Sequence, residues 1–142
     1  MQPEEEQSLR EGICQDFLSV LFTFKHDLIA LADEQGLTIM QLYALIEIKR
    51  MGEMSMGKMA QLLHCDASNV TGITDRLVTK NLLVREENSK DRREKILRPT
   101  SSGVTLVTDC LASLPERLGA GHLSSDELAT FNGILKKINT AS

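Results

Sequence analysis

The sequence has few aromatic residues and lacks the segments that take a chain into or across a membrane. Tryptophan is absent and aromatic residues make up 4% of the 142 positions, so a core must be built from Leu, Ile, Val and Met. No stretch approaches the roughly 18 consecutive apolar residues of a membrane span. The first residues, MQPEEEQ, are acidic, whereas a secretory signal begins with basic residues and continues with apolar ones. We therefore expect a cytoplasmic protein with no membrane partner.

Cysteine is also scarce, and the few cysteines are poorly placed for metal or redox chemistry. Cys14, Cys65 and Cys110 are far apart, and none belongs to a C-x-x-C pair. This spacing favours reduced, mostly buried thiols, and the three histidines show no compact ligand spacing. The chain also lacks a Gly-rich phosphate loop, paired catalytic carboxylates and an H-E-x-x-H motif. We expect no metal, no cofactor and no enzymatic activity.

Charge is present but unevenly distributed. The formal net charge is -4, yet residues 58–98 carry nine basic and six acidic side chains, a net charge of +3. The preceding segment has a net charge of -6 and the following one of -1. An acidic protein with a basic central segment can present that segment to a polyanion while the flanks maintain solubility.

Apolar residues at three- and four-residue steps predict helices at both ends of the chain. The first covers about residues 5–32, and Gly36 suits a left-handed C-cap behind it. Another helix starts at Thr100, and Pro115 should kink or end it. The capping box Ser124–Glu127 opens a last helix.

Between these ends the sequence predicts three shorter helices. A capping box at Thr38 opens a helix that stops near Gly52, and Ser55 caps a short helix over residues 56–63. After a tight turn, Asp66 is a good N-cap for a further helix, and Asn81 suits its left-handed end. A short helix, a tight turn and a second helix are typical of a helix-turn-helix motif.

A β-hairpin is predicted directly after this motif. Two strand-like runs, residues 83–87 and 94–98, are joined by a polar turn. A helix-turn-helix followed by a two-stranded wing can occupy a major groove and reach sideways to the backbone or minor groove. The fold class is therefore mainly α, an α+β winged helix-turn-helix with about six helices.

The helix after Asp66 has an outer face of small polar residues. Ser68, Asn69 and Thr71 are short donors and acceptors near a helix N-terminus, which favours phosphate. Gly72 permits close approach, and Arg76 could read guanine or grip the backbone. For any single residue a solvated helix face explains the pattern as well, but together these residues favour DNA binding.

The hairpin turn, ENSKDRREKIL, concentrates positive charge. A solvated tip would explain the charge alone, but not the acidic Asp91 beside two arginines. A carboxylate there can brace one guanidinium and preorganise it toward DNA. The predicted DNA-binding residues are Ser68, Asn69, Thr71, Gly72, Arg76, Lys80, Lys90, Asp91, Arg92 and Arg93.

Three runs carry a resemblance to a known family: LTIMQLYALIEI, MGKMAQLLHCDASNVTGITDRLVTKNLLVRE and DRREKILRPTSSG. They resemble the MarR (multiple antibiotic resistance regulator) family of winged-helix transcription factors. The most specific part is Asp-x-Arg followed by a strand and a Thr-x-x-Gly helix start, met by Asp91, Arg93, Thr100 and Gly103. Pro99 departs from the pattern, because a Leu is usual before that Thr.

The resemblance implies a ligand-responsive repressor that binds a pseudopalindromic operator as a homodimer. Residues 1–36 and 101–142 would form the dimerisation helices, and residues 37–100 the DNA-binding lobe. Arg93 would enter the minor groove with Asp91 as its brace. The apolar stripes of the long helices independently predict a dimer, because they would otherwise form a large exposed patch. The implied effector is a small aromatic or anionic molecule.

Two alternatives remain open. Cys14 stands where organic-peroxide sensors of the family carry a reactive cysteine, which would make the chain a redox-sensing regulator. Those sensors surround the thiol with tyrosines, and this chain has only Tyr43, so a buried structural thiol is favoured. The second alternative is a winged-helix protein-interaction module without DNA binding.

Overall fold

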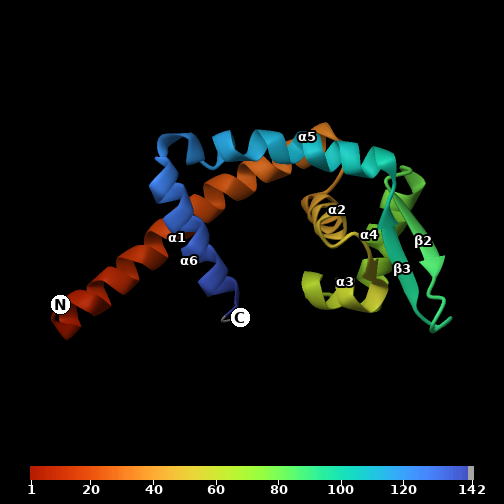
Figure 1. Ribbon diagram of the computed structural model, residues 1–142, viewed down its shortest axis with the longest axis horizontal. Coiled ribbons are helices and arrows are strands. Elements are labelled where there is room, and N and C mark those ends of the chain that lie inside the picture. The colour runs from red at the N-terminus through yellow and green to blue at the C-terminus, as the bar shows by residue number, and fades with distance from the viewer. Residues whose placement is uncertain (141–142) are drawn as a thin grey trace. The chain divides into compact units, whose positions relative to one another are not determined.

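The computed structural model describes residues 1–140, which belong to two compact units. One unit is Lys25–Cys110, and the other combines Met1–Phe24 with the chain from Leu111 onward. The described helices and strands are α1 (Pro3–Glu34), α2 (Ile39–Met51), β1 (Met54–Ser55), α3 (Met56–Leu63), α4 (Ala67–Thr79), β2 (Leu83–Glu87), β3 (Lys95–Pro99), α5 (Ser101–Arg117), the 3-10 helix η1 (Ala120–His122) and α6 (Ser125–Thr140) (Figure 1). The mainly α, winged helix-turn-helix fold predicted from the sequence is confirmed.

The helix boundaries follow local capping chemistry. Thr38 Oγ1 accepts the Gln41 N–H at 3.2 Å, and the Gln41 side chain accepts the Thr38 N–H at 3.0 Å, so the predicted capping box is present. Ser55 caps α3 by accepting the Lys58 N–H at 3.1 Å. The chain leaves α1 through Gly36, whose φ is +65°.

The sheet has one strand more than expected. Its order is β1-β3-β2 with antiparallel neighbours, so β3 is central and the predicted two-stranded wing is extended by β1. Met54 pairs with Leu97, and Ser55 with Ile96. A two-residue strand is too short to show the alternation by which strands are recognised in a sequence. Only its pairing with β3 reveals it.

The core of the Lys25–Cys110 unit is aliphatic, as the composition requires. Helix α4 packs against α2, α3 and β2, and in Figure 1 it lies between α2 and the β2–β3 hairpin. The largest fully buried apolar side chains are Leu42, Leu45, Ile48, Met59, Val70, Leu77, Leu83, Leu97 and Val107. On α4, the apolar Ile73 is only half-buried, whereas the polar Thr74 is fully buried.

Helix α5 starts against this core through a close backbone approach. Thr100 Oγ1 accepts the Gly103 N–H at 3.0 Å, which caps the helix. A Cβ atom at Gly103 would lie 2.2 Å from the carbonyl oxygen of Leu82, so no larger residue fits without a backbone shift. The helix continues through Pro115 and ends two residues later, at Arg117.

The second unit has helices but no buried core of its own. None of its described residues is buried. Exposed apolar side chains on α1 and α6 are instead Leu9, Ile13, Phe17, Leu18, Val20, Leu21, Phe22, Leu128, Phe131, Ile134 and Ile138. Within residues 1–140, no helix combines the length and apolarity needed to cross a membrane.

The unit boundaries differ from the predicted regions. The Lys25–Cys110 unit includes the end of α1 and the first part of α5, beyond the predicted lobe of residues 37–100. Burial explains the extension, because Leu31, Ala32, Val107 and Cys110 belong to the buried set. The assignment of residues 1–36 and 101–142 to dimerisation stays a prediction, and residues 141–142 lie outside the described part.

Candidate nucleic-acid interface

The tight turn between α3 and α4 places the outer helix of the motif. His64 adopts the left-handed conformation at the end of α3, with φ of +49°. Asp66 then caps α4, since its Oδ1 accepts the Asn69 N–H at 2.8 Å. The inward face of α4 presents Val70, Thr74 and Leu77 to the core.

The outward face of α4 carries five of the predicted site residues, and all five are exposed: Ser68, Asn69, Thr71, Gly72 and Arg76. The Thr71 hydroxyl donates to the Ala67 carbonyl at 2.8 Å, which leaves its oxygen free to accept. A Cβ atom at Gly72 would meet nothing within 4 Å. No contact inside the chain therefore requires a glycine at this position, although glycine in a helix interior is less stable than alanine.

The wing holds the predicted Asp91–Arg93 pair at its turn. Asp91 Oδ1 accepts both the Arg93 backbone N–H at 3.0 Å and the Arg93 Nε–H at 3.2 Å. The Arg93 side chain is 92% exposed, whereas that of Asp91 is 47% exposed. These hydrogen bonds from Arg93 hold the pKa of Asp91 below its usual value. The carboxylate therefore stays ionised and directs a guanidinium that projects into solvent.

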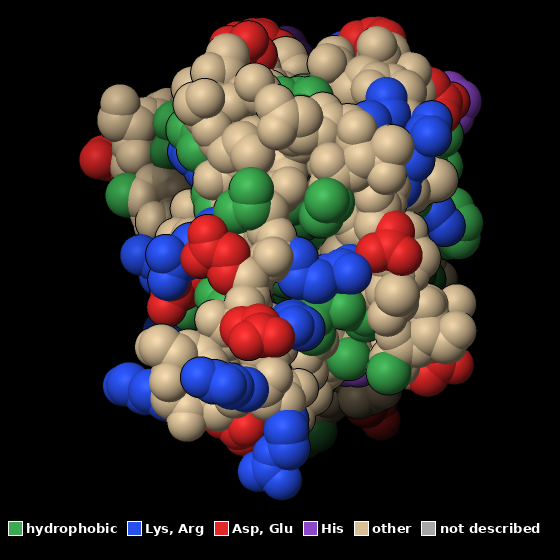
Figure 2. Space-filling view, turned by 90° about the vertical axis from the view of Figure 1, so that its right-hand side faces the viewer, with side chains coloured by type: hydrophobic (Ala, Val, Ile, Leu, Met, Phe, Trp, Pro, Cys, Tyr) green, Lys and Arg blue, Asp and Glu red, His purple; other side chains and the backbone are tan. Residues whose placement is uncertain are grey.

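The other wing cations divide into paired and unpaired groups. Lys95 Nζ lies 3.1 Å from Glu87 Oε1, and Arg98 lies 2.7 Å from a Glu53 oxygen. Among the described residues, the side chains of Lys90 and Arg92 have no such partner and are exposed. In Figure 2, Lys and Arg side chains lie at the lower end of the face shown, and others lie across its middle and at its upper right, with acidic side chains among them. The wing tip therefore keeps uncompensated positive charge.

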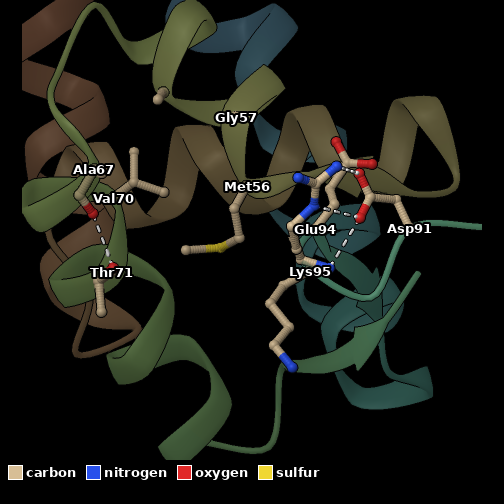
Figure 3. A pocket seen from close by; sticks show the side chains of 10 residues that line it. Met56, Gly57, Ala67, Val70, Thr71, Asp91, Glu94 and Lys95 are labelled. Atoms are coloured by element: carbon tan, nitrogen blue, oxygen red, sulfur yellow. Dashed lines mark hydrogen bonds and ion pairs between the residues drawn. The ribbon is translucent and has the colours of Figure 1, made fainter.

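A groove of about 560 Å³ separates the start of α4 from the wing. Ala67, Val70 and Thr71 line one side, while Asp91 and Lys95 line the other (Figure 3). The remaining lining residues are Met56, Gly57, Ala60, Arg93 and Glu94. Sequence reasoning missed most of them, because small apolar residues of α3 carry no chemical signal until α4 and the hairpin are placed beside them.

Lys80 is the one predicted site residue that the structure places elsewhere. It stands at the C-terminal end of α4, whose 13 residues span roughly 20 Å. A Cβ atom built on Gly36 would lie 2.8 Å from Lys80 Nζ, so this side chain points to the turn after α1. It does not belong to the group formed by the exposed outer face of α4 and the wing turn.

The cysteines show one difference from expectation. Cys110 is buried and Cys65 half-buried, but Cys14 is exposed on α1, so the expected burial of its thiol is wrong for the single chain. The physical reason is that this part of α1 has no buried surface within its unit. Within residues 1–140 no group of three or more potential metal ligands is brought together.

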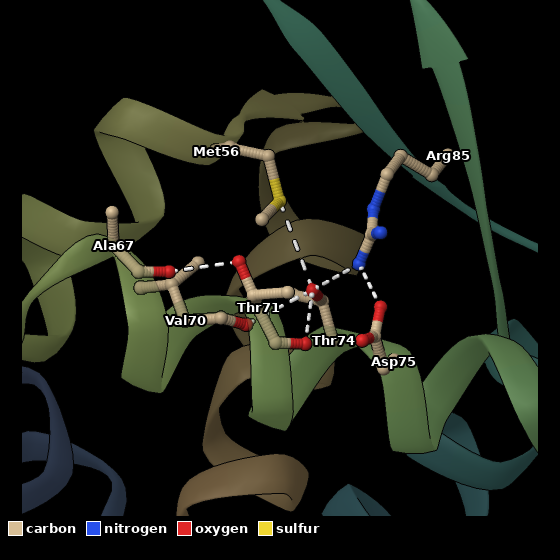
Figure 4. Close-up of polar contacts among 7 residues, drawn as sticks. All are labelled: Met56, Ala67, Val70, Thr71, Thr74, Asp75 and Arg85. Carbon is tan, nitrogen blue, oxygen red and sulfur yellow. Dashed lines mark hydrogen bonds and ion pairs between the residues drawn. The ribbon is translucent and has the colours of Figure 1, made fainter.

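Sequence reasoning also missed a polar cluster between α4 and β2. Arg85 donates to Thr74 Oγ1 and to Asp75 Oδ1, each at 2.6 Å (Figure 4). A lone Arg in a strand-like run gave no indication that it would point inward. The inward direction of Arg85 follows from the structure, in which Leu83 is buried, Val84 is exposed and Arg85 lies on the same side of β2 as Leu83.

Comparison with known proteins is consistent with this geometry. A model of the MarR family matches residues 37–95. The HTH-type transcriptional repressor MdtR of Bacillus subtilis is 36% identical over 80 residues, which cover 56% of this chain and 52% of MdtR. The chain thus spans about half the length of that relative.

Solved structures extend the likeness to nearly the whole chain. The YusO protein of Bacillus subtilis is 26% identical, with a TM-score of 0.67 over 96% of this chain and 98% of that one. A mutant MarR from Escherichia coli, solved in complex with operator DNA, is 23% identical, with a TM-score of 0.67 over 89% of this chain and 93% of that one. Residues 37–95 are thus similar to the MarR family, and nearly the whole chain has a fold similar to those of the YusO protein and of MarR.

Proposed function

We propose that this chain binds double-stranded operator DNA as a homodimer and represses transcription. The observation that carries the proposal is the Asp91–Arg93 pair at the wing turn. An ion pair at so exposed a position adds little to folding stability. It does fix the direction of a guanidinium, which reduces the entropy that Arg93 loses on entering a minor groove.

The outer face of α4 supports a major-groove role. Ser68, Asn69 and Thr71 offer short polar groups near the first turn, where backbone N–H groups also favour phosphate. Gly72 leaves the surface open for close approach. Arg76 is exposed one turn further and has the fork geometry that pairs with guanine.

Electrostatics supports a polyanionic partner despite the net charge of -4. Lys90, Arg92 and Arg93 lie in one turn, whereas the acidic excess lies in the first 57 residues. The phosphate backbone responds to this local field, because charges beyond about 10 Å are largely screened at 0.1 M salt.

The apolar faces of α1 and α6 support dimerisation. Side chains such as Phe17, Leu21 and Phe131 are exposed in the single chain, and the unit that holds them has no buried described residue. A second copy would remove these faces from water. Two-fold symmetry would then set two α4 helices roughly 34–36 Å apart, one turn of DNA, so a pseudopalindromic operator is expected.

The relatives support the finer assignments. MdtR is described as a repressor, and the Escherichia coli MarR mutant was solved with operator DNA. A small aromatic or anionic effector, a cytoplasmic location and a redox role for Cys14 stay predictions. An interaction module without DNA binding is the alternative that the first experiment must separate.

The experiment is a DNA titration at several salt concentrations. Fragments of the source genome are selected with the purified protein, and binding is followed by fluorescence anisotropy between 50 and 200 mM salt. If Arg76, Lys90 and Arg92 of both subunits contact phosphate, six contacts predict a fall in affinity of about 10³-fold. Salt-insensitive binding, or failure to select any fragment, contradicts the proposal.

Arg93→Ala is the matched variant for the wing. We expect it to weaken operator binding by about 1–3 kcal/mol. The melting temperature should not change, because the side chain is 92% exposed. Lys136→Ala on α6 removes one charge outside the proposed interface and serves as the control. Equal affinity of Arg93→Ala and the native protein contradicts the role of Arg93 in the groove.

A further inference from the structure

Arg85 places a cation on the inner side of the wing. Leu83 is buried and Val84 exposed, so the alternation of β2 turns Arg85 inward, toward α4. Its side chain is 26% exposed. One terminal nitrogen donates to both Thr74 Oγ1 and Asp75 Oδ1, each at 2.6 Å (Figure 4).

The hydroxyl oxygen of Thr74 is positioned to accept this hydrogen bond. Thr74 is fully buried, and its hydroxyl lies 2.9 Å from the Val70 carbonyl, to which it can donate within α4. A hydroxyl has one proton and two lone pairs, so the oxygen remains an acceptor for Arg85. Asp75 supplies the charge from the next position of the helix, and its side chain is 57% exposed.

The cluster carries an energetic cost. Arg85 Nε is buried without a hydrogen-bond partner, which destabilises the folded state. An apolar side chain of similar length would have no unpaired N–H group and would avoid that loss. An arginine at this position therefore suggests a requirement other than stability.

That requirement is a fixed geometry between α4 and the wing. Within residues 1–140, the only side-chain hydrogen bonds that join α4 to the β2–β3 hairpin are the two from Arg85. Apolar packing resists separation but allows sliding, whereas hydrogen bonds to two neighbouring residues of one helix define register.

We propose that Arg85 is a positioning residue that couples the wing to α4, so that Arg93 and the outer face of α4 engage one DNA duplex together. This inference rests on the proposed function. Arg85 itself does not contact DNA, because its hydrogen-bonding end is directed at Thr74 and Asp75.

A double-mutant cycle tests the coupling. The affinity for one selected DNA fragment is measured for the native protein, Arg85→Met, Arg93→Ala and the double variant. In the native background Arg93→Ala should cost about five- to 150-fold in affinity. In the Arg85→Met background it should cost less than about threefold, because a wing that is out of register no longer delivers Arg93.

Arg98→Met is the matched control. Arg98 lies on the neighbouring strand of the same sheet, pairs with Val84, and forms ion pairs with Glu53 and Glu86. Like Arg85→Met, this substitution replaces an arginine by methionine, but Arg98 forms its ion pairs with Glu53 and Glu86 and not with α4. It should leave the cost of Arg93→Ala unchanged. An equal loss of coupling in this control overturns the inference, since the effect would then be general to the sheet.

The outcomes separate this inference from the proposed function. Additive costs of Arg85→Met and Arg93→Ala overturn the positioning role while DNA binding stands. The positioning role also fails if Arg85→Met makes DNA affinity less dependent on salt, as the loss of a phosphate contact would, while Arg93→Ala still costs as much affinity as in the native protein. If Arg85→Met does not fold, Asp75→Ala replaces it in the cycle, and additivity there overturns the inference too. A native protein that selects no DNA overturns both.

Discussion

Replacing Gly72 by alanine should make the protein more stable and a poorer DNA binder. The residue lies inside α4, and an added Cβ atom would meet nothing within 4 Å. Alanine in a helix interior is favoured over glycine by about 0.5–1 kcal/mol. Gly72→Ala should therefore raise the free energy of unfolding by that amount, and the melting temperature by roughly 2–5 °C.

The same methyl group should obstruct the proposed interface. If DNA approaches α4 as closely as the absence of a side chain at Gly72 allows, the added Cβ atom of alanine in each subunit must push the helix and the duplex apart. Inserting a methylene into a well-packed contact costs typically 1–3 kcal/mol, which predicts roughly five- to 150-fold weaker binding. Stability and affinity thus move in opposite directions, which a general folding defect cannot produce.

Gly133→Ala supplies the matched control. Gly133 lies inside α6, is exposed, and also has nothing within 4 Å of its missing Cβ atom. At 100° per residue it falls on the opposite side of α6 from the apolar stripe of Leu128, Phe131 and Ile138. The control should gain similar stability without losing affinity. Thermal melts and anisotropy titrations measure both quantities, and unchanged affinity for Gly72→Ala refutes close approach at this residue.

Three further predictions concern the wing, the start of α5 and the oligomeric state. The hydrogen bonds from Arg93 lower the pKa of Asp91, so its carboxylate stays ionised in mild acid and the brace is lost only as pH falls through that lowered pKa. A fall in native DNA affinity between pH 7 and 5.5 that Asp91→Asn abolishes contradicts this. Gly103→Ala should destabilise the fold by about 1–3 kcal/mol in urea titrations, because its Cβ atom would lie 2.2 Å from the Leu82 carbonyl oxygen. The native chain should sediment as a dimer at micromolar concentration and Phe17→Glu as a monomer, since the charge would lie on an exposed apolar face that the proposed dimer removes from water. A monomeric native protein contradicts the two-fold arrangement.

Much of the fold could be predicted because its signals are local. The capping residues Thr38, Ser55 and Asp66 act on backbone groups three residues away. Asn81 takes the left-handed conformation, with φ of +57°, because of its own side chain and its place after a helix. The brace from Asp91 to Arg93 spans only two residues, so it too was visible in the order of side chains.

The sequence by itself thus determined the helices, the hairpin and the chemistry of its turn, because each depends on neighbours within about four positions. Tertiary structure alone decided the pairing of β1, the direction of Lys80 and the exposure of Cys14. It also decided the contacts of Arg85 with Thr74 and Asp75, which lie eleven and ten positions away. Such contacts depend on the angle at which packed elements meet, and that angle is set by the whole core, not by any short segment.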